Sequence, residues 1–245
     1  YRHEGTHWMI FLHKSDGSRW DGIPLARSAD GVHYEELGTV VEVSPDADSL
    51  GSGTVHRLPD GRFIMNLSET RKGVQSIFFL ESRDLRTWRR LEDPGRLAPD
   101  RRVYDDGTSG RWDGIDVLPR PGGGYVGYLT ARPWNGPDDP EYVSVGKLES
   151  EDGLHWRAVA PPRVAWGTMP ESNMYEVGGV EKVGGAYRMM ICQVASERRL
   201  GRRTAWSPGL GDAGMYGFRS VSIDGPFEPD GSSYRLLTSP SWIPG

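Results

Sequence analysis

The 245-residue chain contains one cysteine, Cys192, so no internal disulfide is possible and the fold does not depend on an oxidising compartment. This cysteine ends the apolar run Met189–Cys192, which indicates a buried strand residue rather than a nucleophile. No apolar stretch approaches the roughly 20 residues that a membrane-spanning helix needs. The net charge of −5 argues against nucleic acid or an anionic membrane as a partner. We therefore expect a soluble protein, cytoplasmic or secreted.

Motifs for metals and cofactors are missing as well. The sequence has no His/Cys/Asp cluster with zinc-ligand spacing and no phosphate-binding glycine loop ahead of a helix. Its Asp-rich runs do not match a calcium-binding loop. No segment combines helical periodicity with helix caps. The sequence predicts no metal, no cofactor and an all-β fold.

What the chain does have is glycine, 33 residues, and aromatic side chains, 10% of the total, arranged in four repeats. In each repeat a turn-rich hairpin enters an aromatic strand, and a later Ser-x-Asp-type turn closes on another aromatic. The hairpins are Glu4–Trp8, Asp60–Phe63, Gly122–Tyr125 and Gly184–Tyr187, and the turns are Ser28–Tyr34, Ser82–Trp88, Ser150–Trp156 and Ser222–Phe227. The aromatics that follow the hairpins recur at nearly even intervals along the chain. Such a period, built from short strands and turns, predicts a β-propeller with one repeat per blade.

The repeats account for nearly four blades. The first repeat has no inner strand before Tyr1, and after the fourth the chain reaches Arg235–Leu237. An open propeller would leave unpaired strand edges. We therefore expect one domain over residues 1–245, a five-bladed propeller incomplete at both ends, with a four-bladed ring as the alternative.

Two motifs resemble those of the five-bladed propeller glycoside hydrolases, the superfamily of invertases, levanases, arabinanases, arabinofuranosidases and xylosidases. One is the Ser-x-Asp-Gly-x-x-Trp turn at Ser150–Trp156, and the other is the stretch Met215–Pro229. The resemblance spans most of the chain through short motifs. It implies that inner strands of successive blades bring carboxylates together in a pocket on the propeller axis.

Asp113 is the first carboxylate that the resemblance selects. Arg111–Gly114 reads Arg-Trp-Asp-Gly at the start of an inner strand, where the family has Arg-Asp-Pro, so a tryptophan is inserted and a glycine replaces proline. In the family this aspartate fixes substrate hydroxyls and orients the acid. Asp116 is the second choice, since strand alternation is expected to point Asp113 and Asp116 to opposite faces.

Glu176 is the second carboxylate, placed where the family has its general acid. Its offset from Tyr187, the aromatic of its own repeat, is almost the same as the offset of Asp113 from Tyr125. Both carboxylates are therefore expected at one level of neighbouring blades. Glu181 is the alternative, nearer the distal hairpin.

Hydrolysis also needs a nucleophile or base, which the family carries on the inner strand of the first blade. That position falls upstream of Tyr1, where we expect an aspartate. Asp21, in a second Arg-Trp-Asp-Gly tetrapeptide, is a weak substitute because it precedes a third strand.

Further pocket residues follow from the resemblance and from composition. Gly51–His56 is similar to the Ser-Gly segment of invertase-like enzymes, which makes Ser52, Thr54 and His56 candidates for substrate contact, with a core or turn role equally open. Sugar rings pack on aromatic faces. Among nine tryptophans, Trp112, Trp134 and Trp166 lie in loop-like segments and are the better candidates.

The sequence therefore predicts a glycosidase that acts on the non-reducing end of a carbohydrate, a furanoside or pyranoside, in the manner of fructosidase-like or arabinofuranosidase-like enzymes. Two alternatives stay open, a non-catalytic carbohydrate-binding propeller and a phosphorolytic relative. The latter would need basic residues beside the two carboxylates.

Overall fold

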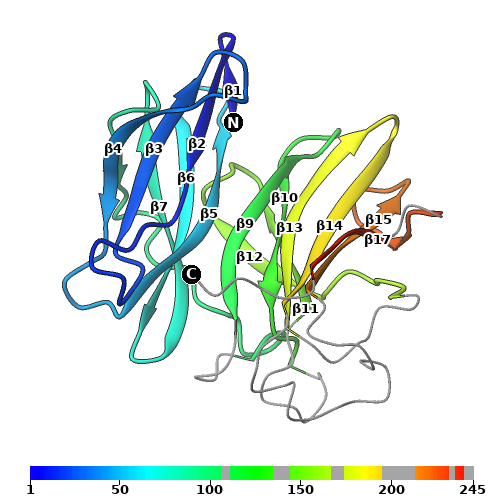
Figure 1. The fold of residues 1–245 in the computed structure, drawn as a ribbon. Helices are drawn as coiled ribbons and strands as arrows, with labels where there is room; N and C mark the ends of the chain where they lie inside the picture. The colour runs from blue at the N-terminus through cyan, green and yellow to red at the C-terminus, as the bar shows by residue number, and fades with distance from the viewer. Residues whose placement is uncertain (106–110, 135–143, 167–173, 195–212, 232–234, 240–245) are drawn as a thin grey trace.

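The computed structural model describes residues 1–105, 111–134, 144–166, 174–194, 213–231 and 235–239. These residues form antiparallel sheets and contain no α-helix, which confirms the expected all-β class. Four sheets follow one another along the chain, and each is one blade of a β-propeller (Figure 1). The fifth blade stays a prediction.

The strands of each blade run in chain order from the inner to the outer edge. Blade 1 consists of β1 (Arg2–His3), β2 (Thr6–Ile10), β3 (Gly22–Ser28) and β4 (Glu35–Glu42). Blade 2 consists of β5 (Ser49–Arg57), β6 (Phe63–Arg71), β7 (Val74–Ser82) and β8 (Arg89–Arg90). Blade 3 consists of β9 (Trp112–Pro119), β10 (Tyr125–Ala131), β11 (Ser144–Ser150) and β12 (Trp156–Val159). Blade 4 consists of β13 (Met174–Val183), β14 (Ala186–Val194), β15 (Ala213–Ser220) and β16 (Glu228–Pro229), with β17 (Arg235–Ser239) also paired to β15.

The repeats in the sequence correspond to these blades. Each hairpin joins the inner strand to the second strand, and each Ser-x-Asp-type turn joins the third strand to the outer one. The turn aspartates explain why this motif recurs. Asp152, for example, accepts hydrogen bonds from the amides of Leu154 and His155 at 2.8 Å each, so the turn satisfies its own backbone.

Hydrophobic cores lie between neighbouring blades. Blades 1 and 2 share a cluster that includes Ile23, Leu50 and Phe78; blades 2 and 3 share one that includes Ile64, Trp112 and Leu129; blades 3 and 4 share one that includes Tyr128, Met189 and Phe218. The inner strand β9 contacts both β5 and β13. Each blade therefore depends on its neighbour for burial, and the inner strands are held side by side around the axis.

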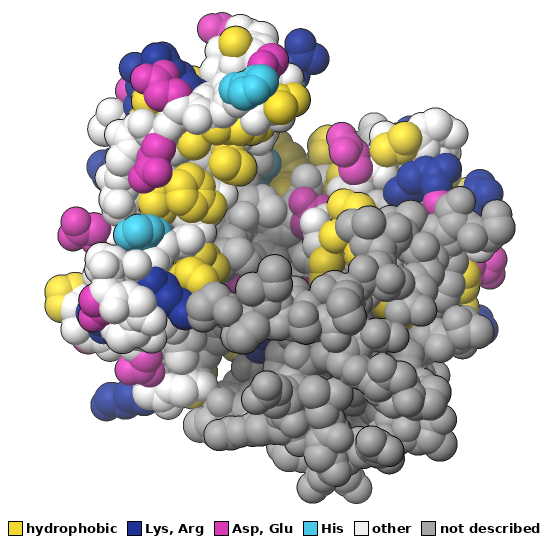
Figure 2. All heavy atoms as spheres, in the orientation of Figure 1, with side chains coloured by type: hydrophobic (Ala, Val, Ile, Leu, Met, Phe, Trp, Pro, Cys, Tyr) yellow, Lys and Arg dark blue, Asp and Glu magenta, His cyan; other side chains and the backbone are white. Residues whose placement is uncertain are grey.

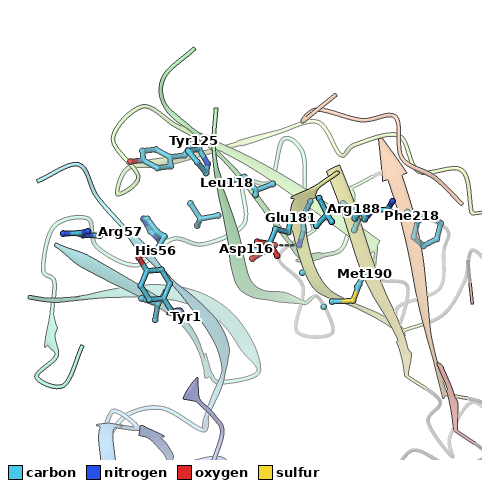
Figure 3. A pocket seen from close by; sticks show the side chains of 18 of the residues that line it. Tyr1, His56, Arg57, Asp116, Leu118, Tyr125, Glu181, Arg188, Met190 and Phe218 are labelled. Atoms are coloured by element: carbon cyan, nitrogen blue, oxygen red, sulfur yellow. Dashed lines mark hydrogen bonds between the residues drawn. The ribbon is translucent and has the colours of Figure 1, made fainter. Parts of the chain in front are cut away.

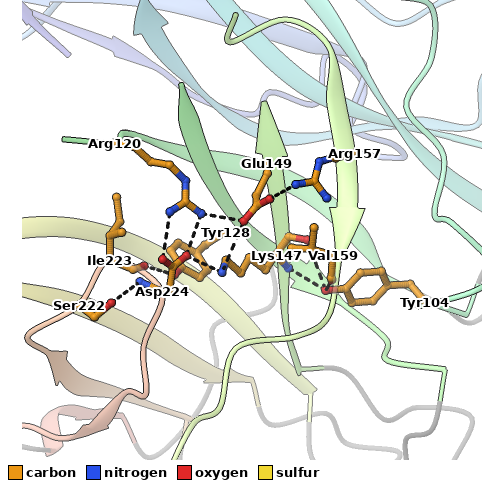
Figure 4. Close-up of polar contacts among 10 residues, drawn as sticks. All are labelled: Tyr104, Arg120, Tyr128, Lys147, Glu149, Arg157, Val159, Ser222, Ile223 and Asp224. Atoms are coloured by element: carbon orange, nitrogen blue, oxygen red, sulfur yellow. Dashed lines mark hydrogen bonds and ion pairs between the residues drawn. The ribbon is translucent and has the colours of Figure 1, made fainter. Parts of the chain in front are cut away.

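Polar contacts add to the seam between blades 3 and 4 (Figure 4). Asp224, in the turn after β15, accepts hydrogen bonds from Arg120 at 2.8 and 3.0 Å and from Lys147 at 2.6 Å. The hydrogen bonds from Arg120 and then Lys147 outweigh burial and lower the pKa of Asp224 to about 2. Beside this network, the buried Tyr128 hydroxyl donates to the carbonyl of Ile223.

All three inner strands described at full length carry a β-bulge near the start. In β5 the pairing with β6 shifts between Leu50 and Gly53, in β9 the pairing with β10 shifts after Asp113, and in β13 the pairing with β14 shifts between Val177 and Gly179. Bulges bend a strand and redirect its side chains, and they are common beside active sites. The three bulges mark one end of the inner strands as the place to look for a site.

Charged side chains of both signs are interspersed over the described surface in the view of Figure 2. In the described part of the chain, no helix is long and apolar enough to cross a membrane.

Candidate active site

Asp113 on β9 and Glu176 on β13 meet at one side chain, Arg111. The Nη2 atom of Arg111 donates to Asp113 Oδ2 and to Glu176 Oε1, each at 2.8 Å. The two carboxylate oxygens are therefore no further apart than twice that distance. Asp113 is 12% exposed and Glu176 is 36% exposed, so the first is enclosed and the second is open to an incoming ligand.

The charge of Arg111 is secured by its two partners. Burial lowers the pKa of this guanidinium, but the adjacent Asp113 and Glu176 more than offset that effect and the pKa is raised. The structure also places a basic residue beside both carboxylates, which the sequence analysis did not identify.

Two residues that the sequence analysis missed approach Asp113 from blade 2. Ser68 on β6 donates its hydroxyl proton to Asp113 Oδ1. Gln75 on β7 donates through Nε2 to Ser68 Oγ at 2.9 Å and accepts through Oε1 from the backbone amide of Trp112 at 3.0 Å. Ser68 is completely buried. Both oxygens of Asp113 therefore accept hydrogen bonds, one from each side.

The bulge in β9 interrupts the regular alternation from which Asp113 and Asp116 were expected to point to opposite faces. Asp113 pairs with Thr130 and Asp116 pairs with Tyr128, two residues apart on β10, so Gly114 and Ile115 together stand opposite one residue. The two side chains still contact different blades: Asp113 accepts a hydrogen bond from Ser68 of blade 2, and Asp116 accepts one from the amide of Val180 of blade 4.

Gly114 makes the bulge possible. Its φ of 36° lies in the left-handed region, and an added Cβ would come within 3.1 Å of the Ser52 carbonyl oxygen on β5. The glycine that departs from the family's Arg-Asp-Pro pattern is thus explained by the close approach of blades 2 and 3.

Asp116 contacts blade 4 rather than the Arg111 bridge. Its Oδ2 accepts a hydrogen bond from the amide of Val180. Burial, which outweighs this hydrogen bond, raises the pKa of Asp116 to about 6, and the nearby Glu181 contributes in the same direction.

The other candidates on β5 contact blade 3. Thr54 Oγ1 donates to the carbonyl of Ile115 at 2.6 Å, and His56 Nε2 lies 3.0 Å from the carbonyl oxygen of Gly153. Burial lowers the pKa of His56 to about 4, so the imidazole is neutral and Nε2 is the donor. These contacts give both residues a place in the blade seam. Ser52 is exposed at the bulge, and a role in substrate contact stays a prediction for all three.

The three tryptophans are placed differently. Trp112 is on β9 rather than in a loop, is 1% exposed and donates to the carbonyl of Leu97, so its ring has no face to offer a sugar. Trp166 packs edge-on against Phe218 in the core between blades 3 and 4. Trp134 is 56% exposed and stays a candidate for stacking.

A cavity of about 1100 Å³ lies further along the inner strands (Figure 3). Its lining comes from the later parts of β5, β9 and β13 and from residues of β10, β14 and β15, and includes His56, Asp116, Tyr125, Glu181 and Met190. Glu181, the alternative general acid, belongs to this cavity and pairs in register with Arg188, away from the Arg111 bridge.

Among the described residues, no three His, Cys, Asp or Glu side chains are grouped so that they could hold a metal ion. The site therefore contains two carboxylates held by hydrogen bonds, one of them accessible, beside the permanent positive charge of Arg111. That set suits proton transfer to and from a substrate oxygen.

The chain matches no protein-family model and no curated protein sequence. Its structure is similar to solved carbohydrate-processing enzymes. One is the levansucrase of Bacillus subtilis in complex with oligosaccharides, with a TM-score of 0.71, 13% identity, and coverage of 96% of this chain and 68% of that chain. Another is an exo-β-1,3-galactanase from Clostridium thermocellum, with a TM-score of 0.62, 14% identity, and coverage of 93% of this chain and 46% of that chain.

A third similar structure is an exo-1,5-α-L-arabinanase from a bovine ruminal metagenomic library, with a TM-score of 0.61, 12% identity, and coverage of 96% of this chain and 73% of that chain. At such identities the likeness concerns the fold. The chain has the β-propeller fold found in levansucrases and in exo-acting galactanases and arabinanases, as the sequence motifs indicated.

Proposed function

We propose that this protein is a glycosidase that cleaves the non-reducing end of a furanoside or pyranoside at the Arg111 bridge. Glu176 is the general acid and Asp113 is the carboxylate that orients the sugar and the acid. The observation that carries the proposal is the single guanidinium that binds both carboxylates across the seam of blades 3 and 4.

The geometry supports different roles for the two carboxylates. Inverting glycosidases separate their reacting carboxyls by about 6.5–9.5 Å, and retaining ones by about 5–5.5 Å with the scissile bond between them. Here a guanidinium occupies the space between Asp113 and Glu176, so the pair lies on one side of a bound sugar. The nucleophile or base is then a third carboxyl, which we expect ahead of Tyr1 on the inner strand of blade 1.

Glu176 suits the acid role because it is the more exposed of the two carboxyls and its contact with Arg111 is made through Oε1. Its other oxygen can face the glycosidic oxygen of a substrate. A general acid contributes about 10²–10⁴-fold when the leaving group needs protonation, and much less when the leaving group is an activated phenol.

The Glu176→Gln variant tests this assignment. We expect hydrolysis of natural sugars to fall by about 10²–10⁴-fold, and hydrolysis of nitrophenyl glycosides to fall by about tenfold or less. The panel includes sucrose, which is bound in a solved levansucrase structure, and arabinan and β-1,3-galactan oligosaccharides, which the names of the other two similar enzymes indicate. Nitrophenyl furanosides and pyranosides complete it.

Glu181→Gln is the matched control, since Glu181 is a carboxylate on the same strand but lines the cavity further along the inner strands, away from Arg111. It should retain activity on both substrate types. Equal losses for Glu176→Gln on natural and activated substrates would remove Glu176 from the acid role.

The same assay separates the alternatives. Cleavage that requires inorganic phosphate would favour a phosphorolytic enzyme, for which Arg111 supplies a positive charge. Sugar binding measured by calorimetry, without turnover of any substrate in the panel, would favour a carbohydrate-binding propeller.

A further inference from the structure

Asp113 is held by a chain of hydrogen bonds that begins at a backbone amide. The amide of Trp112 can only donate, so Gln75 must present its carbonyl oxygen to it and its NH₂ group to Ser68. The Ser68 oxygen accepts this bond and has one proton left to give. That proton goes to Asp113 Oδ1.

The direction of every bond in this chain is therefore fixed by chemistry. An amide N–H cannot accept, the Gln75 amide is oriented by it, and the Ser68 hydroxyl is oriented by Gln75 in turn. At the other oxygen of Asp113, Arg111 is also a pure donor. Asp113 receives a donor at each oxygen, an arrangement that only the ionised carboxylate satisfies fully.

The bulge of β5 gives the Ser68 hydroxyl its path to blade 3. Gly51 and Ser52 together stand opposite Ser68. A Cβ at Gly51 would lie 2.0 Å from Ser68 Oγ and 2.8 Å from Asp113 Oδ1. The hydroxyl reaches Asp113 through the space that this glycine leaves open.

We propose that Ser68 and Gln75 are positioning residues that hold Asp113 as an ionised acceptor, so that the proton delivered to the leaving group comes from Glu176 alone. The inference rests on the proposed function for the roles of the two carboxylates. It adds two residues from blade 2 that the sequence motifs did not identify.

Activity of the Ser68→Ala variant is the first test. A hydrogen bond to a charged group is lost, so kcat/KM should fall by about 10–100-fold, mostly through kcat, because sugar hydroxyls are bound most tightly in the transition state. The acidic limb of the pH profile should move to higher pH, since a donor to the charged form is removed. A packing defect alone would lower activity without moving that limb.

Two further variants test the same hydrogen bond if Ser68→Ala folds poorly. Ser68→Cys keeps a weak donor at similar volume and should recover part of the activity and part of the limb shift. Gly51→Ala should crowd the contact and reproduce the shift, whereas its matched control Gly122→Ala places a Cβ where nothing lies within 4 Å and should leave the profile unchanged.

A second measurement is independent of turnover. In protein with ¹³C-labelled aspartate carboxyls, the signal assigned by its loss in Asp113→Asn should titrate at higher pH in Ser68→Ala than in the wild type. An unchanged titration would overturn the positioning role, whatever the enzyme cleaves. A shifted titration in a protein that hydrolyses no sugar would leave the hydrogen-bond chain standing and reject the proposed glycosidase instead.

Discussion

Asp116 carries a prediction that can be worked out from its surroundings. Burial raises the pKa of this carboxyl from 3.8 to about 6 in the folded protein. Between about pH 4 and pH 6 the folded state holds a proton that the unfolded state has released. The contribution of Asp116 to stability must therefore fall as the pH rises through this window and stay level above it.

The size of the effect follows from the shift. About two pKa units, at 1.36 kcal/mol each, correspond to about 3 kcal/mol of stability lost when Asp116 is ionised. Asn in its place keeps an oxygen that can accept from the Val180 amide and carries no charge. We expect Asp116→Asn to be more stable than the wild type at pH 7.5 by up to about 3 kcal/mol, or roughly 6–12 °C in Tm for a chain of this size.

The assay is thermal unfolding followed by circular dichroism at intervals from pH 4 to pH 8. The melting temperatures of the wild type and of Asp116→Asn should be equal near pH 4, and the difference between them should grow up to about pH 6. Glu181→Gln serves as a second variant, since removal of this neighbour should give a smaller gain of the same sign. A melting temperature for Asp116→Asn that stays below the wild type at pH 7.5, or a difference that does not depend on pH, would refute the reasoning.

Two other predictions concern the blade seams. Gly53→Ala should fold poorly or lose more than about 10 °C in Tm, because its Cβ would lie 1.6 Å from the carbonyl oxygen of Asn66; recovery of normal yield and melting temperature would show that the strands can separate there. Asp224→Asn should lower Tm by about 2–4 °C at pH 7, roughly 1 kcal/mol after allowance for solvent screening, because Arg120 and Lys147 lose their charged partner. Since the pKa of Asp224 is lowered to about 2, this loss should fade as the pH falls through about 4 to 2; a constant difference across that range would assign it to packing instead.

The repeats predicted the blades because each one encodes its own local chemistry. Glycine at the hairpins supplies the backbone freedom that a tight turn needs, and the turn aspartates satisfy neighbouring amides. Both signals act over a few residues, so they can be recognised from the sequence alone. Asp113 and Glu176 have nearly the same offset from the aromatic residue that follows the hairpin of their own repeat. These offsets were enough to predict that the two carboxylates lie on neighbouring blades, because the hairpins are of similar length.

The contacts within the site could not be read in the same way. Ser68 and Gln75 belong to the preceding blade, far ahead of Asp113 in the chain, in strands whose sequence shows only apolar residues with polar ones between them. The burial of Trp112 could not be predicted, because its two neighbours in the sequence, an arginine and an aspartate, are charged. The bulge between Asp113 and Asp116 was not predicted either, and Gly114 was the one available clue, a glycine inside a strand.

The amide of Asn66 has a consequence for how such propellers can be recombined. It binds both backbone groups of Ile115, donating to the carbonyl at 2.9 Å and accepting from the N–H at 2.6 Å. The strand that carries Asp113 thus has part of its own backbone pairing supplied by the preceding blade. In chimeras assembled from different propellers, blades 2 and 3 should be exchanged as a pair, since a crossover between them would orphan two buried peptide groups next to the carboxylate.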